Sequence, residues 1–256
     1  MSTGKEGNFT FVWANDTHYV DEKDDGFLVR VMEKIKNSNP KPDFVVIGGD
    51  VTEKGTAQQY DGAQKAFRTL GDIPLRVVIG NHDYGNDKEG LRTWEKYFGD
   101  RNYWFGHKGW QFVGLDTTGG SDAYVNTSVQ TCTLHWVREH LPKLNKTKPT
   151  VILTHFPLAE NVKWRPHNAD ELLRLFREYN LVNVFSGHWH GYTSRKRNET
   201  ILTTNVCCSN RTENGKPLEG EGHQSIDKGY IVCRCMNGRI HREYVVVEEN
   251  ETGQPC

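Results

Sequence analysis

The stretch Gly80–Asp83 (Gly-Asn-His-Asp) directly follows an apolar and β-branched run, Leu75–Ile79, so it stands where a buried strand is expected to end. Its glycine allows the backbone to turn sharply, and an amide, an imidazole and a carboxylate then follow one another. One Asn-His-Asp sequence can be an ordinary turn. What it means therefore depends on the residues at the other strand ends of the chain.

Four other apolar runs of the strand type end in polar residues of the same kinds. After the runs Phe9–Trp13, Asp43–Ile47, Thr150–Thr154 and Leu181–Ser186 come, respectively, Asp16 and His18, Asp50, His155, and His188 and His190. A single histidine on a loop is more often structural than functional. Five strand ends that all carry such residues favour a functional site.

Helical patterns lie between these strands, for example over 24–36, where Phe27, Val31 and Ile35 recur at four-residue steps. The alternation of strand and helix predicts an α/β fold in which parallel strands are joined by right-handed crossovers. Ligands bind such sheets beyond the carboxyl ends of the strands. We therefore expect the five polar strand ends to meet at one edge and to form one site.

The 256 residues contain no linker, internal repeat or low-complexity tract, so we predict a single domain over residues 1–256. A hairpin is expected over 103–116. Beyond residue 190 the pattern becomes all-β, with strands near 192–196, 200–206, 229–235 and 239–247, which defines a C-terminal β region over 191–248. The polar, Gly-rich insert 210–228 follows one of these strands, and its length makes it a candidate lid over the site.

Composition argues against two classes of partner. The formal net charge is -1 and the sequence has no basic stripe, so bulk charge selects neither a nucleic-acid polymer nor a membrane surface. No run of about 18 apolar residues occurs, so no membrane span is expected. The six cysteines form no metal-binding spacing and are interpreted as free or incidentally paired thiols.

The seven Asn-x-Ser/Thr sequons favour an exported or periplasmic protein over a cytoplasmic one. Two observations oppose this prediction. The segment Met1–Gly7 is polar and has no apolar signal region, and the sequon at Asn15 lies inside a candidate metal loop.

The residues at the five strand ends supply nitrogen and oxygen donors and no thiolate, a set that suits Mn, Fe, Zn or Co. If such a site held two divalent ions with only two carboxylates, Asp16 and Asp50, a local positive charge would remain. Such a charge attracts a phosphate even though the chain is nearly neutral as a whole. Two adjacent ions can also generate a hydroxide at neutral pH and stabilise its in-line attack on phosphorus.

Five short motifs occur in a fixed order along the chain. They are Asp-x-His at 16–18, Gly-Gly-Asp at 48–50, Gly-Asn-His-Asp at 80–83, Thr-His at 154–155 and Gly-His-Trp-His at 187–190. In this order they resemble the calcineurin-like metallophosphoesterase superfamily, over about residues 9–190. The resemblance implies a sandwich of two mixed β-sheets flanked by helices, with a dinuclear metal site at the carboxyl ends of the strands.

The resemblance also implies a role for each matching position. The seven implied metal ligands are Asp16, His18 and His190 for the first ion, Asn81, His155 and His188 for the second, and Asp50 as a bridge between both. His82 matches the catalytic histidine of the family, which contacts the substrate phosphate and is proposed to protonate the leaving group. Asp83 is expected to orient His82.

The implied activity is dinuclear metal-dependent hydrolysis of a small phosphoester by a metal-bridging hydroxide, with general-acid assistance to the leaving oxygen. The motif set resembles the cyclic-nucleotide phosphodiesterase branch, so we predict a phosphodiesterase, with cyclic nucleotides among its candidate substrates. A phosphomonoesterase is the alternative, because related branches hydrolyse diesters, monoesters or both. A metal-binding scaffold without catalysis is the third interpretation, and the presence of His82 with all seven implied ligands argues against it.

Specificity is expected in the loops around the metals. Tyr84 and Trp189 adjoin ligand motifs, and Trp164 and Arg165 follow the loop of His155. The aromatic rings are candidates for stacking on a flat group, and Arg165 for clamping a phosphate oxygen, with ordinary loop packing as the alternative for each. Five histidines match no motif and are interpreted as surface or packing residues: His107, His135, His140, His223 and His241.

Overall fold

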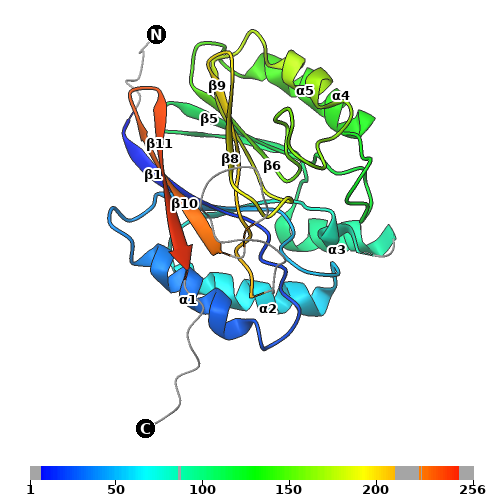
Figure 1. The fold of residues 1–256 in the computed structure, drawn as a ribbon, viewed down its shortest axis with the longest axis vertical. Coiled ribbons are helices and arrows are strands. Elements are labelled where there is room, and N and C mark those ends of the chain that lie inside the picture. Colours follow the sequence, from blue (N-terminus) through cyan, green and yellow to red (C-terminus); the bar gives the residue numbers. More distant parts are fainter. Residues whose placement is uncertain (1–6, 86–87, 211–224, 226, 248–256) are drawn as a thin grey trace.

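The computed structural model describes residues 7–85, 88–210, 225 and 227–247, with no side-chain description at 88–90. The chain forms two mixed β-sheets that face each other, and helices cover the outer face of each sheet (Figure 1). This is the α/β sandwich predicted from the sequence, and the prediction is confirmed. Among the described residues, none of the helices combines the length and the apolarity that crossing a bilayer requires.

The first sheet has the strand order β11-β10-β1-β2-β3. Its parallel strands are β1 (Phe9–Ala14), β2 (Phe44–Gly48) and β3 (Leu75–Val78). Beside them, β10 (Lys228–Met236) pairs antiparallel with β1, and β11 (Arg239–Val247) pairs antiparallel with β10. The helices α1 (Asp25–Lys36), α2 (Ala57–Phe67) and α3 (Lys88–Phe98) accompany this sheet, and their apolar residues join one core cluster with it.

The second sheet has the strand order β4-β5-β6-β7-β9-β8. Its strands are β4 (Tyr103–His107), β5 (Trp110–Leu115), β6 (Thr150–Thr154), β7 (Leu181–Ser186), β8 (Thr193–Arg197) and β9 (Thr200–Thr204). The helices α4 (Thr131–His140) and α5 (Ala169–Leu175) pack on its outer face. Short 3₁₀ turns occur at Arg68–Leu70, His82–Tyr84 and Leu141–Lys143.

The alternation of side chains along β1 explains how the sheets pack together. Phe11 and Trp13 point into the layer between the two sheets, whereas Val12 points to the helices, because successive side chains of a strand lie on opposite faces. In the middle layer the ring of Phe11 stacks on Phe44 of its own sheet at 5.2 Å and meets Phe112 of the other sheet edge-on at 5.5 Å. Aromatic packing therefore fixes the two sheets against each other.

The C-terminal strands and the 103–116 hairpin are present as predicted, but the strands do not form one C-terminal layer. β8 and β9 extend the second sheet, whereas β10 and β11 extend the first, with β10 antiparallel to β1. The lid predicted over 210–228 concerns mainly residues 211–224 and 226, which lie outside the described residues, as does His223. The five described cysteines form no disulfide with one another.

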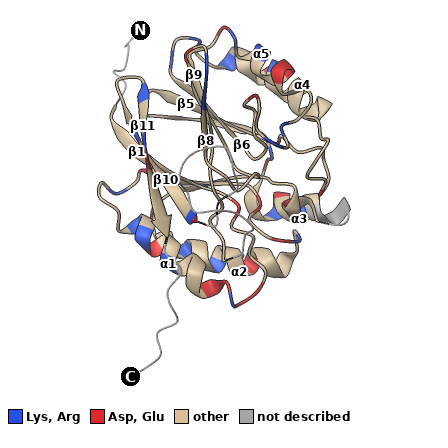
Figure 2. Ribbon diagram, in the orientation of Figure 1, with Lys and Arg blue, Asp and Glu red and all other residues tan. Residues whose placement is uncertain are grey.

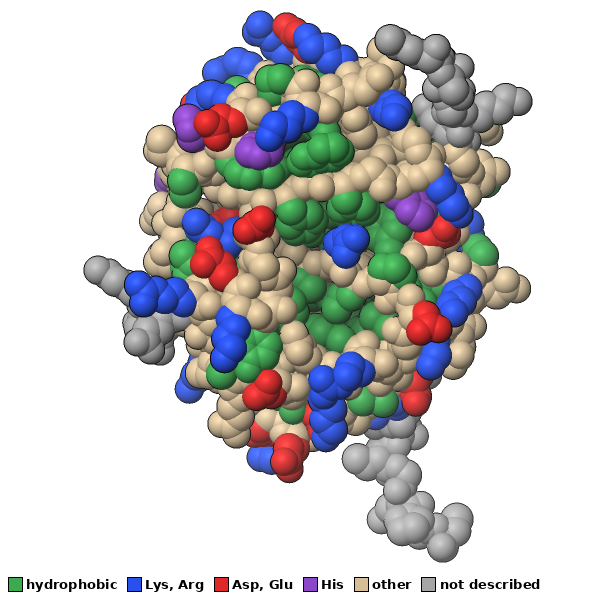
Figure 3. Space-filling model, turned by 180° about the vertical axis from the view of Figure 1, so that it is seen from behind, with side chains coloured by type: hydrophobic (Ala, Val, Ile, Leu, Met, Phe, Trp, Pro, Cys, Tyr) green, Lys and Arg blue, Asp and Glu red, His purple; other side chains and the backbone are tan. Residues whose placement is uncertain are grey.

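The face turned away from the viewer of Figure 1 carries an apolar hollow (Figure 3). A cavity of about 630 Å³ opens between the edge strands β3 and β4 and is lined in part by Leu75, Phe98 and Trp104. None of the lining residues is a predicted metal ligand, so this cavity is separate from the site described next.

Candidate metal centre

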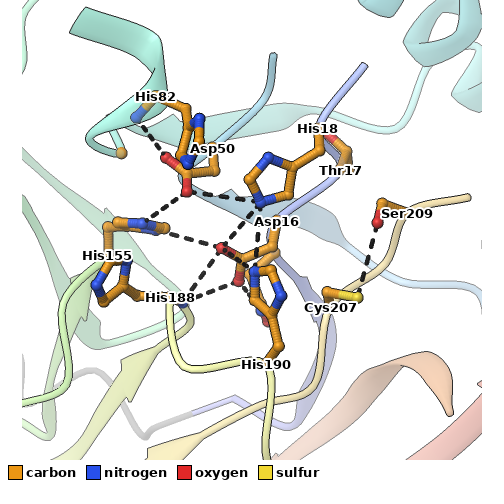
Figure 4. Close-up of polar contacts among 12 residues, drawn as sticks. Asp16, Thr17, His18, Asp50, His82, His155, His188, His190, Cys207 and Ser209 are labelled. Atoms are coloured by element: carbon orange, nitrogen blue, oxygen red, sulfur yellow. Dashed lines mark hydrogen bonds and ion pairs between the residues drawn. The ribbon is translucent and has the colours of Figure 1, made fainter. Parts of the chain in front are cut away.

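The strand ends predicted to carry the site meet at one edge of the sandwich. Side chains from the ends of β1, β2, β6 and β7 converge there, as Figure 4 shows for six of them. All seven implied ligands are buried: Asp16, His18, Asp50, Asn81, His155, His188 and His190. Buried carboxylates and imidazoles gathered in one place require compensation, which a bound cation can provide.

Asp16, His18 and His190 form a first group whose donor atoms lie within 4.8 Å of one another. The Nε2 atoms of His18 and His190 are 3.3 Å apart, and Nε2 of His190 is 3.3 Å from Oδ1 of Asp16. The Nδ1 atom of His18 is 2.8 Å from Oε2 of Glu53. This contact fixes the proton of His18 on Nδ1 and leaves Nε2 as the atom that could bind a metal ion.

Asp50, His155 and His188 form a second group of the same kind, and Asn81 joins it. Nε2 of His155 lies 3.2 Å from Oδ2 of Asp50 and 3.2 Å from Oδ1 of Asn81. The other ring nitrogen of His155 faces the carbonyl of Gly48 at 2.9 Å. Nε2 of His188 faces the carbonyl of Tyr124 at 2.9 Å, which leaves Nδ1 of His188 as the donor atom.

Asp50 lies between the two groups. Its Oδ2 atom is 3.6 Å from Nε2 of His18 in the first group and 3.2 Å from Nε2 of His155 in the second. The donors are nitrogens and oxygens, outer partners fix the ring tautomers of His18, His155 and His188, and one carboxylate is shared. This arrangement fits two divalent ions, one at each group, as predicted from the sequence.

At the site the backbone adopts conformations that are uncommon for residues other than glycine. Five of the seven ligands have positive φ values: Asp16 (55°), His18 (43°), Asp50 (48°), His188 (67°) and His190 (53°). Such residues are uncommon and cluster at functional sites. The glycines of the motifs have a different role, because a Cβ at Gly80 would lie 2.1 Å from Oδ1 of Asp50.

The charges of the site are strongly coupled. Burial raises the pKa of Asp50, but His155 and other nearby histidines outweigh burial and hold that pKa well below its ordinary value. Burial lowers the pKa of His155, yet the carboxylates of Asp50 and Asp16 raise it to about 9. Burial and the charge of His155 lower the pKa of His188 to about 3. The carboxylates are therefore ionised and His188 is neutral, which are the forms that bind metal, whereas His155 has to release a proton when metal binds.

His82 differs from the ligands, because its side chain remains 32% exposed. Its Nδ1 atom lies 3.0 Å from the carbonyl oxygen of Glu53, and its ring meets the ring of His18 edge-on at 4.8 Å. Its backbone N–H donates to Oδ1 of Asp50 at 2.9 Å. When Nδ1 carries the proton shared with Glu53, Nε2 of His82 is available beside the metal ligands.

A model of the calcineurin-like phosphoesterase family matches residues 9–192. The chain belongs to this family. The probable glycerophosphodiester phosphodiesterase GpdQ of Arcobacter nitrofigilis is 27% identical over 188 residues, 66% of this chain and 64% of that protein. The serine/threonine-protein phosphatase CPPED1 of Bos taurus is 27% identical over 179 residues, 63% of this chain and 57% of that protein. The chain therefore spans less than two thirds of the length of these two relatives.

A solved structure of another protein has the same fold. The purple acid phosphatase PPD1 from yellow lupin matches with a TM-score of 0.69 at 14% identity, over 94% of this chain and 52% of that chain. At this identity the match supports the sandwich fold alone. It agrees with the two mixed sheets and outer helices of the calcineurin-like phosphoesterase described above.

The predicted role of Asp83 in this family member is corrected by the structure. The Asp83 carboxylate accepts hydrogen bonds from the backbone N–H groups of Val51, Thr52 and Gly80, at 3.2, 3.1 and 3.0 Å. Burial, and then the charge of Asp50, raise its pKa to about 7. Asp83 therefore ties the loop after β2 to the loop after β3.

Glu53, which the sequence analysis missed, takes the role expected of Asp83. Its carbonyl oxygen contacts Nδ1 of His82, and its carboxylate contacts His18 and lies 3.8 Å from Nδ1 of His82. The available signal was a carboxylate only three residues beyond the Gly-Gly-Asp motif at 48–50.

Three of the four residues predicted to contact substrate are engaged in other contacts. Tyr84 is only 5% exposed, and its hydroxyl donates to Oδ2 of Asp116 at 2.5 Å. The Arg165 guanidinium donates to the carbonyl of Leu158 at 2.9 Å and to Asp170 at 2.7 Å, which favours the alternative of ordinary loop packing over the predicted phosphate clamp.

The two tryptophans predicted to contact substrate, Trp189 and Trp164, lie in different surroundings. Trp189 is only 4% exposed and packs in the core between the second sheet and its helices, so it is a packing residue. Trp164 packs against the ring of the ligand His188 at 5.2 Å, and for this residue the substrate-binding role stays a prediction.

Proposed function

We propose that this chain is a phosphodiesterase that hydrolyses a small phosphodiester with the help of two divalent metal ions. The observation that carries the proposal is the shared position of Asp50 between two buried donor groups, with the partly exposed His82 beside them. The similarity to a probable glycerophosphodiester phosphodiesterase supports the diester class. The motif resemblance to cyclic-nucleotide phosphodiesterases keeps cyclic nucleotides among the candidate substrates.

The ions would be held by the two groups, and Mn, Fe, Zn and Co all suit their nitrogen and oxygen donors. Bound ions would supply Lewis-acid chemistry, polarising a phosphoryl oxygen and lowering the pKa of water. The remaining work belongs to side chains of the protein. Asp50 keeps the two groups in register, and the fixed tautomers of His18 and His155 keep their Nε2 atoms directed at the same place.

His82 is the proton donor in this proposal. Its Nδ1–H is held by the Glu53 carbonyl, so Nε2 faces away from that contact and can protonate the oxygen that leaves phosphorus. Unlike the ligands, it is open to solvent and hence to a substrate. His82 therefore separates a hydrolase from a metal-binding scaffold.

A phosphomonoesterase is the second candidate function, and the similarity to the phosphatase CPPED1 favours it. A nucleic-acid polymer is not the proposed substrate. Such partners need several phosphate contacts from Lys or Arg, and Figure 2 shows basic and acidic residues interspersed, for instance along α1 and α2.

The test is a comparison of bis(p-nitrophenyl) phosphate with p-nitrophenyl phosphate, for protein loaded in turn with Mn, Fe, Zn or Co. We expect diester hydrolysis with at least one metal. Loss of the general acid in His82→Ala should lower kcat about 10²–10⁴-fold without loss of bound metal, measured by elemental analysis. His135→Ala, on the exposed side of α4, is the matched control. Hydrolysis of the monoester alone would favour the second candidate, and inactivity with every metal would overturn the proposal.

A further inference from the structure

Two aromatic rings, Trp164 and Tyr124, run outward from His188 of the second group of donors. The ring of Trp164 lies 5.2 Å from the ring of His188, and Tyr124 meets Trp164 edge-on at 6.2 Å. His188 in turn packs on the buried ring of Phe156 at 4.0 Å. The rings thus form a continuous path from the core, past a metal ligand, to the surface.

The loop that carries Tyr124 is anchored to the donors themselves. The amide nitrogen of Asn81 donates to the carbonyl of Asp122 at 3.2 Å, and Nε2 of His188 faces the carbonyl of Tyr124 at 2.9 Å. Both contacts orient residues whose other side-chain atom faces the second group. The backbone that carries the Tyr124 ring is therefore held beside the site by the same contacts that orient Asn81 and His188.

Tyr124 and its neighbour Val125 are unusually open to solvent for apolar residues beside a polar centre. Their exposed fractions are 57% and 37%, and they are the one adjacent pair among the five exposed large hydrophobic residues in the described part of the chain. A single exposed apolar residue needs no explanation. Two neighbours next to a packed Trp ring and a metal ligand form an apolar surface of the kind that binds ligands.

We infer that Tyr124 and Trp164 form a subsite for the organic group that stays on phosphorus, and that this subsite takes flat, aromatic groups. The inference rests on the proposed phosphodiesterase function. The proposed proton donor His82 packs against His18 of the first group, so the leaving group lies on that side. The Tyr124–Trp164 wall packs against His188 of the second group, and Figure 4 shows Asp50 between His82 and His188.

This geometry gives the wall a role in choosing the substrate. A phosphomonoester has no retained organic group, so the wall contributes nothing to its binding. A diester with a small retained group such as methyl leaves the wall uncovered. A diester with a retained aryl group can cover it, and contact between aromatic rings adds affinity beyond buried area alone.

Two diesters with the same leaving group test this directly. Bis(p-nitrophenyl) phosphate and methyl p-nitrophenyl phosphate both release p-nitrophenol and differ in the group that stays. We expect Tyr124→Ala to lower the ratio of their kcat/KM values about three- to tenfold, mainly through KM of the aryl diester. Tyr124→Phe should keep the ratio, because the ring is what binds. Trp104→Ala, which removes a 40% exposed aromatic ring on β4, is the matched control and should not change it.

A binding measurement gives a second readout. In the His82→Ala background, calorimetry should show that Tyr124→Ala weakens binding of the aryl diester by the same factor and leaves that of the methyl diester unchanged. A ratio that is unchanged in Tyr124→Ala and Trp164→Ala, in an enzyme that hydrolyses both diesters, would overturn the subsite alone. If the wild type hydrolyses no diester, the proposed function fails, and the calorimetric comparison still decides whether an aryl-binding wall exists.

Discussion

A substitution at Glu53 can distinguish the metal-binding role proposed for His18 from the proton-donating role proposed for His82. Its carboxylate accepts from Nδ1 of His18 at 2.8 Å, whereas its main-chain carbonyl, at 3.0 Å, is the hydrogen-bond partner of Nδ1 of His82. The carboxylate is 3.8 Å from Nδ1 of His82, too far for a hydrogen bond. Replacing the side chain therefore removes the outer partner of a metal ligand and keeps the partner of His82.

The size of the effect follows from the role of outer hydrogen bonds at metal sites. Loss of such a partner costs about 10–100-fold in metal affinity, or roughly 1.4–2.7 kcal/mol. Glu53→Gln keeps an oxygen acceptor for His18 and should fall at the lower end. Glu53→Ala leaves Nδ1 of His18 without this acceptor and should fall at the upper end.

The assay titrates metal-free protein with Mn²⁺ by calorimetry and follows kcat for bis(p-nitrophenyl) phosphate as the Mn²⁺ concentration rises. Both variants should bind Mn²⁺ more weakly, yet approach the wild-type kcat at saturation, to within about threefold. His82→Ala should stay slow at every Mn²⁺ concentration. Glu199→Gln, at an exposed turn, is the matched control. Unchanged Mn²⁺ affinity together with a low kcat at saturation would refute the reasoning, because Glu53 would then act on His82.

Three further outcomes follow from the same geometry. Gly80→Ala places a Cβ 2.1 Å from Oδ1 of Asp50, so it should lower stability by about 1–3 kcal/mol in urea unfolding and weaken Mn²⁺ binding. Asp83→Asn turns an amide NH₂ toward the N–H donors of Val51 or Thr52, so it should destabilise by about 1–3 kcal/mol even without metal; unchanged urea midpoints would contradict this. Metal removal with EDTA should lower the unfolding free energy by about 2.7 kcal/mol for each ion lost, relative to protein at 100-fold excess of metal over Kd, seen as a lower melting temperature.

The order of the two sheets shows where sequence reasoning ends. Strand ends and helix patterns are local, so the motif-bearing parallel strands and the 103–116 hairpin could be predicted. The insertion of β10 beside β1 joins residues more than 200 positions apart, for example Trp13 and Ile231. Nothing in the local pattern of either strand specifies this partner, because both are apolar strands that fit a sheet interior.

The predictions for individual site residues failed where a contact in the folded protein does not follow from position in the sequence. Asp83 follows His82 directly, but consecutive residues of a 3₁₀ turn point in different directions, so their side chains contact different neighbours. Arg165 stands near the motifs in sequence and is held by Asp170 in the structure. The contact of Tyr124 with the site could not be predicted, because it is made by a backbone carbonyl, which every residue has.

The strained backbone of the implied ligands raises the question whether the protein or the metal holds the donor side chains in position. Sparsely populated φ/ψ regions cost about 1–3 kcal/mol per residue, and five ligands lie in the left-handed region. The protein itself holds these residues: the backbone N–H of Asp16 donates to Gly49 at 2.9 Å, that of His18 donates to Asp50 at 2.9 Å, and that of His188 donates to the Asp16 carboxylate at 2.9 Å. Because these contacts need no ion, the donors stand in place before metal binds. Metal should therefore add stability by mass action to a chain that is already folded, unlike the small zinc domains that unfold when metal is removed.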